Sequence, residues 1–277
     1  MKTSSASQPD TAPKHEALEI ISHSPKKGSA HKTPLLFVHG AFAGAWCWEE
    51  SFLPWFAERG WTVHAVSLSG HGSSRNPIGL DNLGINNYVN DVTETIALLP
   101  TPPVLIGHSM GGMVVQKYLE KSTVPAAVLM ASVPPQGLIH SAIGLLLSAP
   151  QLLIDLNRIM GGGEPNPDTM LQTLFYNSLD EKKIQRYLEM FQPESHRAIW
   201  DMTFFNLPLV FRIHRPPMLV LGAQHDRLFS PSQVKLTASA YGTRPEIFAD
   251  MGHAMMLEPN WKEVAERIDG WLNSQGF

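Results

Sequence analysis

A serine between two glycines is the first feature of this sequence that could do chemistry. The stretch "VLIGHSMGG" places Ser109 directly after an apolar run, inside the pattern G-x-S-x-G from Gly107 to Gly111. Where a strand ends and a helix begins at this pattern, a sharp bend strains the serine backbone and exposes its hydroxyl above the sheet. A chance match or a plain turn is the alternative. The pattern predicts a nucleophile if partners elsewhere in the chain activate it.

A serine hydroxyl is a weak nucleophile, so it needs a base that an acid orients. In "DMGHAMMLEP", His253 follows an apolar run that reads as the last strand; the chain has 12 histidines, so this position matters more than the residue type. In "LVLGAQHDRLFS", Asp226 follows a strand that ends near Gly222. Asp250 competes for the acid's role, but it falls within or at the end of its own strand. We predict the catalytic residues Ser109, Asp226 and His253.

Attack on a carbonyl group develops an oxyanion, which preorganised N–H donors must stabilise. The stretch "FVHGAF" follows the first apolar run of the parallel sheet, and its His-Gly turn lets the N–H of Ala41 face the serine. We predict an oxyanion hole formed by the backbone N–H groups of Ala41 and Met110, with Phe42 as a further neighbour. His39 is expected to orient this loop rather than to act in catalysis.

Short apolar runs bounded by turn residues predict the strands of a mostly parallel sheet. Continuous rather than alternating apolar runs suit strands that are covered on both faces. These runs lie at 35–38, 63–68, 104–106, 127–130, 218–222 and 246–252, and residues 15–24 could add an antiparallel edge strand.

Helical patterns alternate with these runs. They lie at 46–59, 86–98, 110–121, 231–241 and, most clearly, from Trp261 to Leu272, where Asn260 and Glu263 resemble a capping box. Strands that alternate with helices predict an α/β fold with a doubly wound sheet and right-handed crossovers.

The strand signals vanish from about Pro135 to His214, where the sequence is helical and apolar. We predict a disordered tail at 1–16, an α/β core at 17–134 and 215–277, and a helical cap at 135–214. Sites in such sheets lie beyond the carboxyl ends of the strands, so the cap should roof the site. The cap contains large apolar side chains that either line a pocket or, for the most part, pack the cap onto the core. They are Leu145, Leu146, Leu147, Met160, Phe175, Phe191, Trp200, Phe204 and Phe205.

Composition excludes several classes of protein. A net charge of −4 offers no electrostatic grip on nucleic acid, and the single cysteine, Cys47, excludes an intrachain disulfide. No apolar stretch approaches the roughly 20 residues that span a bilayer, and the polar N-terminus does not read as a signal peptide. The histidines are scattered, and "SGHGSS" lacks the spacing of a phosphate cradle. We expect a soluble cytoplasmic protein, monomer or homodimer, without metal or cofactor.

Together these motifs resemble the α/β-hydrolase superfamily over residues 17–275. The matching pieces are "FVHGAFAGAWCWEE", "SLSGHGSS", "GHSMGG", "GAQHDRLF" and "GHAMMLEP". Two of them, "HGAFAGAWCW" and "GHSMGGMV", are also similar to the plant methyl esterase and hydroxynitrile lyase group and its bacterial relatives. The resemblance implies the same triad and the same oxyanion pair. The stretch "MGGGEPNPDTMLQTLFYN" does not read like the plant cap, so plant substrates are not implied.

We therefore expect a serine hydrolase that cleaves carboxylic esters with a hydrophobic acyl or alcohol part through an acyl-enzyme. Other chemistry on the same triad remains open: C–C bond hydrolysis, lactone opening, perhydrolysis or cyanohydrin cleavage. A small-molecule receptor or a scaffold protein is a further alternative. The positions of Ser109, Asp226 and His253 at strand ends argue against both. An arginine clamp for an acidic substrate, from Arg75, Arg158 or Arg212, is not indicated.

Overall fold

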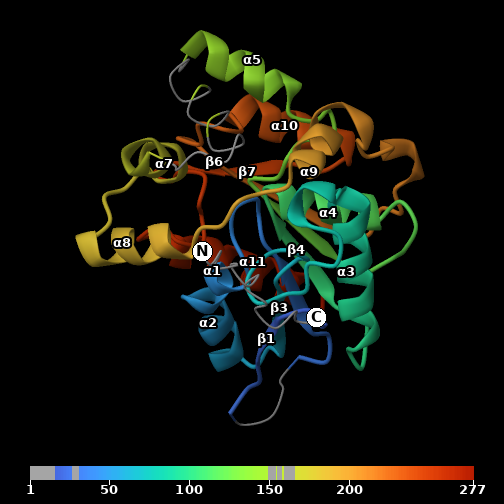
Figure 1. Ribbon diagram of the computed structural model, residues 1–277. Coiled ribbons are helices and arrows are strands. Elements are labelled where there is room, and N and C mark those ends of the chain that lie inside the picture. The colour runs from blue at the N-terminus through green and yellow to red at the C-terminus, as the bar shows by residue number, and fades with distance from the viewer. Residues whose placement is uncertain (1–15, 27–30, 149–153, 155–157, 159–165) are drawn as a thin grey trace, which may run out of the picture.

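The computed structural model describes residues 16–26, 31–148, 154, 158 and 166–277. Within this part of the chain, one seven-stranded sheet runs in the order β1-β3-β2-β4-β5-β6-β7 (Figure 1). β1 is antiparallel to β3, and every other neighbouring pair is parallel. The strands are β1 (Ile20–His23), β2 (Leu35–Val38), β3 (Val63–Val66), β4 (Val104–His108), β5 (Ala127–Met130), β6 (Met218–Ala223) and β7 (Pro245–Phe248). The predicted sheet, with its antiparallel edge strand, is confirmed.

The central strands are apolar throughout because helices cover both faces of the sheet. In β2, Leu35 and Phe37 belong to the core on one face, whereas Leu36 and Val38 belong to the core on the other face. This alternation follows from the two-residue period of a strand. Each strand therefore anchors two layers of helices and holds the loops at its carboxyl end in place.

The helices around the sheet lie close to the predicted segments. They are α1 (Trp46–Glu49), α2 (Phe52–Glu58), η1 (Leu80–Asn82), α3 (Ile85–Ala97), α4 (Met110–Tyr118), α10 (Pro231–Ala240) and α11 (Trp261–Ser274).

Two predictions about these helices are wrong in detail. The expected single helix at 46–59 is broken at Ser51, where φ is −147°. Pro54 explains the break, because its ring would clash with the carbonyl of Glu50 in a continuous helix. At α11, Asn260 forms no side-chain cap; its amide instead donates to the carbonyl oxygen of Asp250 at 3.0 Å.

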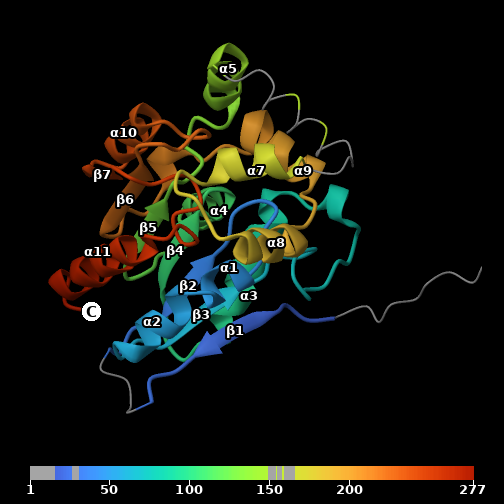
Figure 2. The ribbon, with the colours of Figure 1, turned by 90° about the vertical axis from the view of Figure 1, so that its left-hand side faces the viewer.

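A helical stretch is inserted between β5 and β6. It contains α5 (Ile139–Ser148), α7 (Pro167–Leu174), α8 (Glu181–Met190), α9 (His196–Trp200), the π-helix η2 (Asp201–Phe205) and the 3-10 helix η3 (Val210–Arg212). Two perpendicular views place α5 at the outer edge of the molecule, away from the strands (Figures 1 and 2). Residues 149–153, 155–157 and 159–165 of the predicted cap, and 1–15 of the predicted tail, lie outside the described residues. The division into core and cap stays a prediction.

In the described part of the chain, none of the helices combines the length and apolar character needed to cross a membrane.

Candidate active site

Ser109 lies at a strained bend between β4 and α4. Its backbone has φ 53° and ψ −118°, a conformation that costs a non-glycine residue about 1–3 kcal/mol. Neighbouring backbone groups hold the bend: the Ser109 N–H donates to Met130 O, and its carbonyl oxygen accepts from the N–H groups of Gly112 and Val133, all at 3.0 Å. Gly107 permits the tight turn, because a Cβ there would lie 2.5 Å from the carbonyl oxygen of Gly111. The predicted sharp turn at this serine is present.

His253 and Asp226 are brought together by two loops at the carboxyl ends of β6 and β7. His253 Nδ1 lies 2.8 Å from Asp226 Oδ2, and both side chains are buried. The other oxygen, Oδ1, accepts from the backbone N–H groups of Leu228 and Phe229 at 2.8 and 2.9 Å. Because Nδ1–H faces the carboxylate, Nε2 keeps a lone pair that can accept a proton.

Asp250, the competing acid, is placed differently. It is exposed, and its carbonyl oxygen accepts hydrogen bonds from the amides of Asn177 and Asn260. Its carboxylate makes no bond to His253 among the residues described. The structure therefore pairs the histidine with Asp226.

Ser109 and His253 are connected through His108. His108 Nε2 donates to the carbonyl oxygen of His253 at 2.9 Å, and the centroids of the two rings lie 4.8 Å apart. Burial, with the neighbouring His253 as a second cause, lowers the pKa of His108 well below its ordinary value, so this donor is neutral. Within the described chain, the hydroxyl of Ser109 forms no direct hydrogen bond with His253.

The loop after β2 lies against the serine. A Cβ on Gly40 would come within 2.9 Å of both Ser109 Cβ and His108 Nδ1, so only glycine allows this approach. The N–H groups of Ala41 and Met110 donate no hydrogen bond to any described residue. Two unused donors beside the bend are what an oxyanion hole requires.

His39 fixes this loop from below. Its Nδ1 donates to the carbonyl oxygen of Gly40 at 2.7 Å, and its Nε2 accepts from the N–H of Leu68 at 3.0 Å. Burial, assisted by the nearby His71, lowers the pKa of His39 to about 3. A neutral ring is therefore maintained in this position, which agrees with the expected orienting role.

A network of polar contacts that the sequence analysis missed ties the inserted stretch to the core. Gln192 N donates to the carbonyl oxygen of Phe42, and Gln192 Oε1 accepts from Gly72 N. Nearby, Glu194 Oε2 lies 3.1 Å from His71 Nε2, and Glu194 Oε1 accepts from the Tyr88 hydroxyl at 2.7 Å. No spacing signal could reveal these contacts, because the partners are far apart in the sequence.

Each member of the buried pair stabilises the charged form of the other. Burial acts to lower the pKa of His71, but the charge and hydrogen bond of Glu194 outweigh it, so the pKa lies above its ordinary value. For Glu194, burial acts to raise the pKa, and the charge of His71 outweighs it, so the pKa lies below its ordinary value. An ion pair thus holds the inserted stretch next to the loop of His39.

Glu258 is a second residue that the sequence analysis missed. Its buried carboxylate accepts from the N–H groups of Tyr176, Gly252 and Asn177 at 2.6, 2.8 and 3.2 Å. It therefore ties the turn after α7 to the loop of His253. The sequence signal that could have identified Glu258 is an acidic residue within the apolar stretch "AMMLEP".

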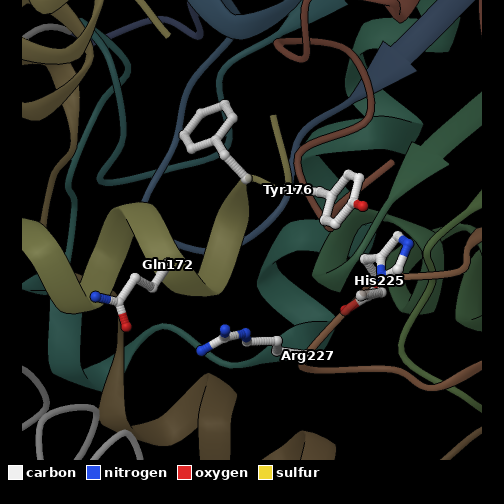
Figure 3. Close-up of a pocket in the computed structure, with 6 residues that line it drawn as sticks. Gln172, Tyr176, His225 and Arg227 are labelled. Carbon is white, nitrogen blue, oxygen red and sulfur yellow. The ribbon is translucent and has the colours of Figure 1, made fainter. Parts of the chain in front are cut away.

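Two cavities lie on either side of the Asp226 loop. One, of about 530 Å³, is lined by Gln172, Phe175, Tyr176, His225, Asp226 and Arg227 (Figure 3). The other, of about 440 Å³, is lined by His140, Ser141, Gly144, Leu145, Asp226, Arg227, Leu228, Ser230 and Gln233. Ser109 lines neither of them; Asp226 connects both to His253.

The predicted lining residues are only partly found there. Phe175 and Leu145 line these cavities, and Phe191 packs edge-on against Trp46 with ring centroids 5.6 Å apart. Four of the candidates line neither cavity and lie at least half exposed to solvent: Leu146, Trp200, Phe204 and Phe205. Met160 and the side chain of Leu147 lie outside the described residues.

Among the residues that the structure describes, no group of three or more His, Cys, Asp or Glu side chains is arranged to hold a metal ion. Cys47 is buried and unpaired by any disulfide, and burial raises the pKa of its thiol above the usual range.

Comparison with known proteins adds the family. Over 135 residues the chain is 28% identical to "Putative methylesterase 11, chloroplastic" of Arabidopsis thaliana. The aligned region covers 47% of this chain and 34% of that protein. Over 113 residues it is 32% identical to "Esterase PIR7B" of Oryza sativa subsp. japonica. This aligned region covers 39% of this chain and 41% of that protein. The matches thus span less than half the length of these relatives.

Solved structures share the fold over nearly the whole chain. The crystal structure titled as a "putative aryl esterase" from Burkholderia cenocepacia superposes with a TM-score of 0.71 and 22% identity, covering 93% of this chain and 94% of that chain. At this identity the likeness shows the fold alone. A model of the alpha/beta hydrolase family matches residues 35–267, which is most of the chain. With its elbow serine between β4 and α4, this protein belongs to the alpha/beta hydrolase family.

Proposed function

We propose that this protein is a serine hydrolase of carboxylic esters, with Ser109 as nucleophile, His253 as base and Asp226 as the acid that orients it. The observation that supports this most is the 2.8 Å bond between His253 Nδ1 and Asp226 Oδ2, beside a serine at a strained strand-to-helix bend. The N–H groups of Ala41 and Met110 form the oxyanion hole.

The reaction proceeds in two halves. As Ser109 Oγ attacks the ester carbonyl, His253 Nε2 takes the hydroxyl proton, and the carbonyl oxygen becomes an oxyanion that accepts from the two N–H groups. The C–O bond to the alcohol then breaks, and His253 gives its proton to the departing alkoxide. A water molecule attacks the acyl-enzyme in the same way, which releases the acid and restores Ser109.

The first proton transfer requires Ser109 Oγ to reach His253 Nε2. Catalytic hydrogen bonds are often long without substrate and shorten only in the complex. His108 limits the movement needed, because it is next to Ser109 in the chain and bonds to the carbonyl oxygen of His253. Substrate binding then completes the contact.

An ester is the substrate class that the comparisons favour. Two relatives are named methylesterase and esterase. The cavities at Asp226 each contain an apolar side chain, Phe175 in one and Leu145 in the other, which suits an ester with an apolar part. The helices α5, α7, α8 and α9 act as a cap over this region.

A fluorophosphonate probe tests the proposal. The wild-type protein should be labelled on Ser109, and Ser109→Ala should abolish labelling. His253→Ala and Asp226→Asn should reduce labelling and the turnover of p-nitrophenyl esters strongly, whereas Asp250→Asn, the matched control, should not. If folded protein neither reacts with the probe nor turns over any ester, the proposal fails. If Asp250→Asn has the effect expected for Asp226→Asn, the assignment of the acid is wrong.

A further inference from the structure

Arg227 follows the proposed catalytic acid directly and lines both cavities. Other arginines, such as Arg75, Arg186 and Arg267, pair with carboxylates. Arg227 is exposed and forms no ion pair with any carboxylate of the described residues. A guanidinium without an anionic partner thus lies where the two cavities meet.

Hydrogen-bond donors and a rigid aromatic wall surround this charge. Figure 3 shows Gln172, on α7, and Arg227, on the loop after β6, reaching toward the same space. The rings of Tyr176 and His225 stack beside them with centroids 3.7 Å apart and planes within 5°. The wall of the larger cavity is therefore built from both the inserted stretch and the core.

The carboxylate of Asp226 does not neutralise Arg227. One of its oxygens is bonded to His253, and the other accepts from the N–H groups of Leu228 and Phe229. Its charge is thus directed into the protein, toward the histidine that becomes cationic during the reaction. Arg227 is the one lysine or arginine among the residues that line the two cavities, and no described carboxylate is paired with it.

The second cavity adds polar and apolar surface on the other side of Arg227. Gln233 Nε2 donates to Ser141 Oγ at 2.8 Å, which joins α10 to α5 across it. Leu145 and Leu228 supply apolar wall. A chain with an apolar middle and an anionic end matches this combination better than a wholly neutral chain.

We propose that Arg227 binds a free carboxylate of the substrate, so that the preferred esters are monoesters of dicarboxylic acids. A planar guanidinium can bind a carboxylate through two parallel hydrogen bonds. The proposal rests on the ester hydrolase function, and it adds the chemical class of the acyl part. Arg227 acts in substrate binding and takes no part in proton transfer.

Specificity constants for paired esters test this inference. Ethyl monoesters of dicarboxylic acids, from succinate to suberate, are compared with the ethyl esters of monocarboxylic acids of matching length. The wild-type protein should prefer at least one monoester, and Arg227→Gln should lower that preference on the order of tenfold, the size of one lost charge-assisted pair. Arg227→Lys should retain part of it. Arg212→Gln, which changes an exposed arginine stacked near Phe211, should retain all of it.

Raising the ionic strength should reduce the preference for monoesters, because salt screens a solvent-exposed pair between Arg227 and the substrate carboxylate. If the wild-type protein hydrolyses neutral esters but shows no preference that Arg227→Gln lowers, the inference is overturned and the ester hydrolase function stands. If it hydrolyses no ester at all, the proposed function fails. Calorimetric titration with adipate then tests separately whether Arg227 binds a carboxylate. Saturable binding that Arg227→Gln weakens would support it, and absence of binding would overturn it.

Discussion

His108 donates a hydrogen bond from Nε2 to the carbonyl oxygen of His253 at 2.9 Å, so the residue before Ser109 holds the loop of the proposed base. The ring is neutral because burial lowers its pKa. Its Nδ1 is buried without a partner in the described structure, and the ring lies beside Gly40. One side chain thus contacts the base loop and the oxyanion loop.

His108→Ala should lower kcat by about tenfold to a hundredfold, because small displacements of a catalytic group have effects of that size. His108→Gln keeps a donor of similar reach and should recover part of the loss. Steady-state kinetics with one ester, together with thermal unfolding, measure both effects. His64→Ala changes a histidine on β3 and should leave kcat as it is. If His108→Gln and His108→Ala lose activity equally, the hydrogen bond to His253 is not what positions the base.

Gly40→Ala should reduce kcat on the order of a hundredfold with little change in KM, since a new Cβ at 2.9 Å from Ser109 Cβ must displace the oxyanion loop. Gly270→Ala is the matched control. It lies exposed on α11 with nothing within 4 Å of a new Cβ, so it should stabilise the helix by about 0.5–1 kcal/mol. Kinetics and denaturant unfolding of both variants test this. Wild-type turnover by Gly40→Ala would show that the loop tolerates the displacement.

Glu194→Gln should lower the free energy of unfolding by about 3–5 kcal/mol near pH 6, because it leaves His71 without its buried partner. The loss should depend on pH. The raised pKa of His71 stabilises the fold fully below its ordinary value of 6.5, and this contribution disappears as pH rises through the folded pKa. The lowered pKa of Glu194 stabilises the fold above its ordinary value of 4.5, and this contribution disappears as pH falls through the folded pKa.

The difference between wild type and Glu194→Gln should therefore be largest from about pH 4.5 to 6.5 and shrink at higher pH. Urea unfolding at several pH values measures it. Asp81→Asn removes the exposed pair between Asp81 and His196 and should cost less than about 1 kcal/mol. A difference that grows with pH would contradict a charged pair at His71.

Glu258→Ala should destabilise the protein by several kcal/mol, because each of three backbone N–H groups loses its acceptor at about 1–3 kcal/mol. Activity at low temperature should also fall, since the loop of His253 loses its anchor. Glu263→Ala, at an exposed position in the first turn of α11, should change stability by less than about 0.5 kcal/mol. Equal stability of the two variants in urea would exclude the anchoring role.

Local patterns in the sequence were sufficient for much of the fold. Continuous apolar runs predicted the parallel strands, because burial on both faces leaves no polar position in them, as at β2. The glycines at 107 and 111 predicted the bend at Ser109, because only small residues allow strand and helix to approach so closely. Periodicity failed where a single residue breaks it, as at Pro54 in the first turn of α2, which separates α2 from α1.

The sequence by itself therefore limited the candidate catalytic residues to a few side chains at strand ends. Residue type, covalent neighbours and periodicity can all be read directly from the sequence. Which of them meet was decided by packing. His253 bonds to Asp226 and not to Asp250, and Glu194 reaches His71, because folding brings segments distant in the chain to one edge of the sheet. Exposure was likewise decided in three dimensions: Trp200 faces solvent, although Ala198 and Met202 on the same stretch are buried. Such contacts depend on relative positions of whole elements, which short-range patterns do not contain.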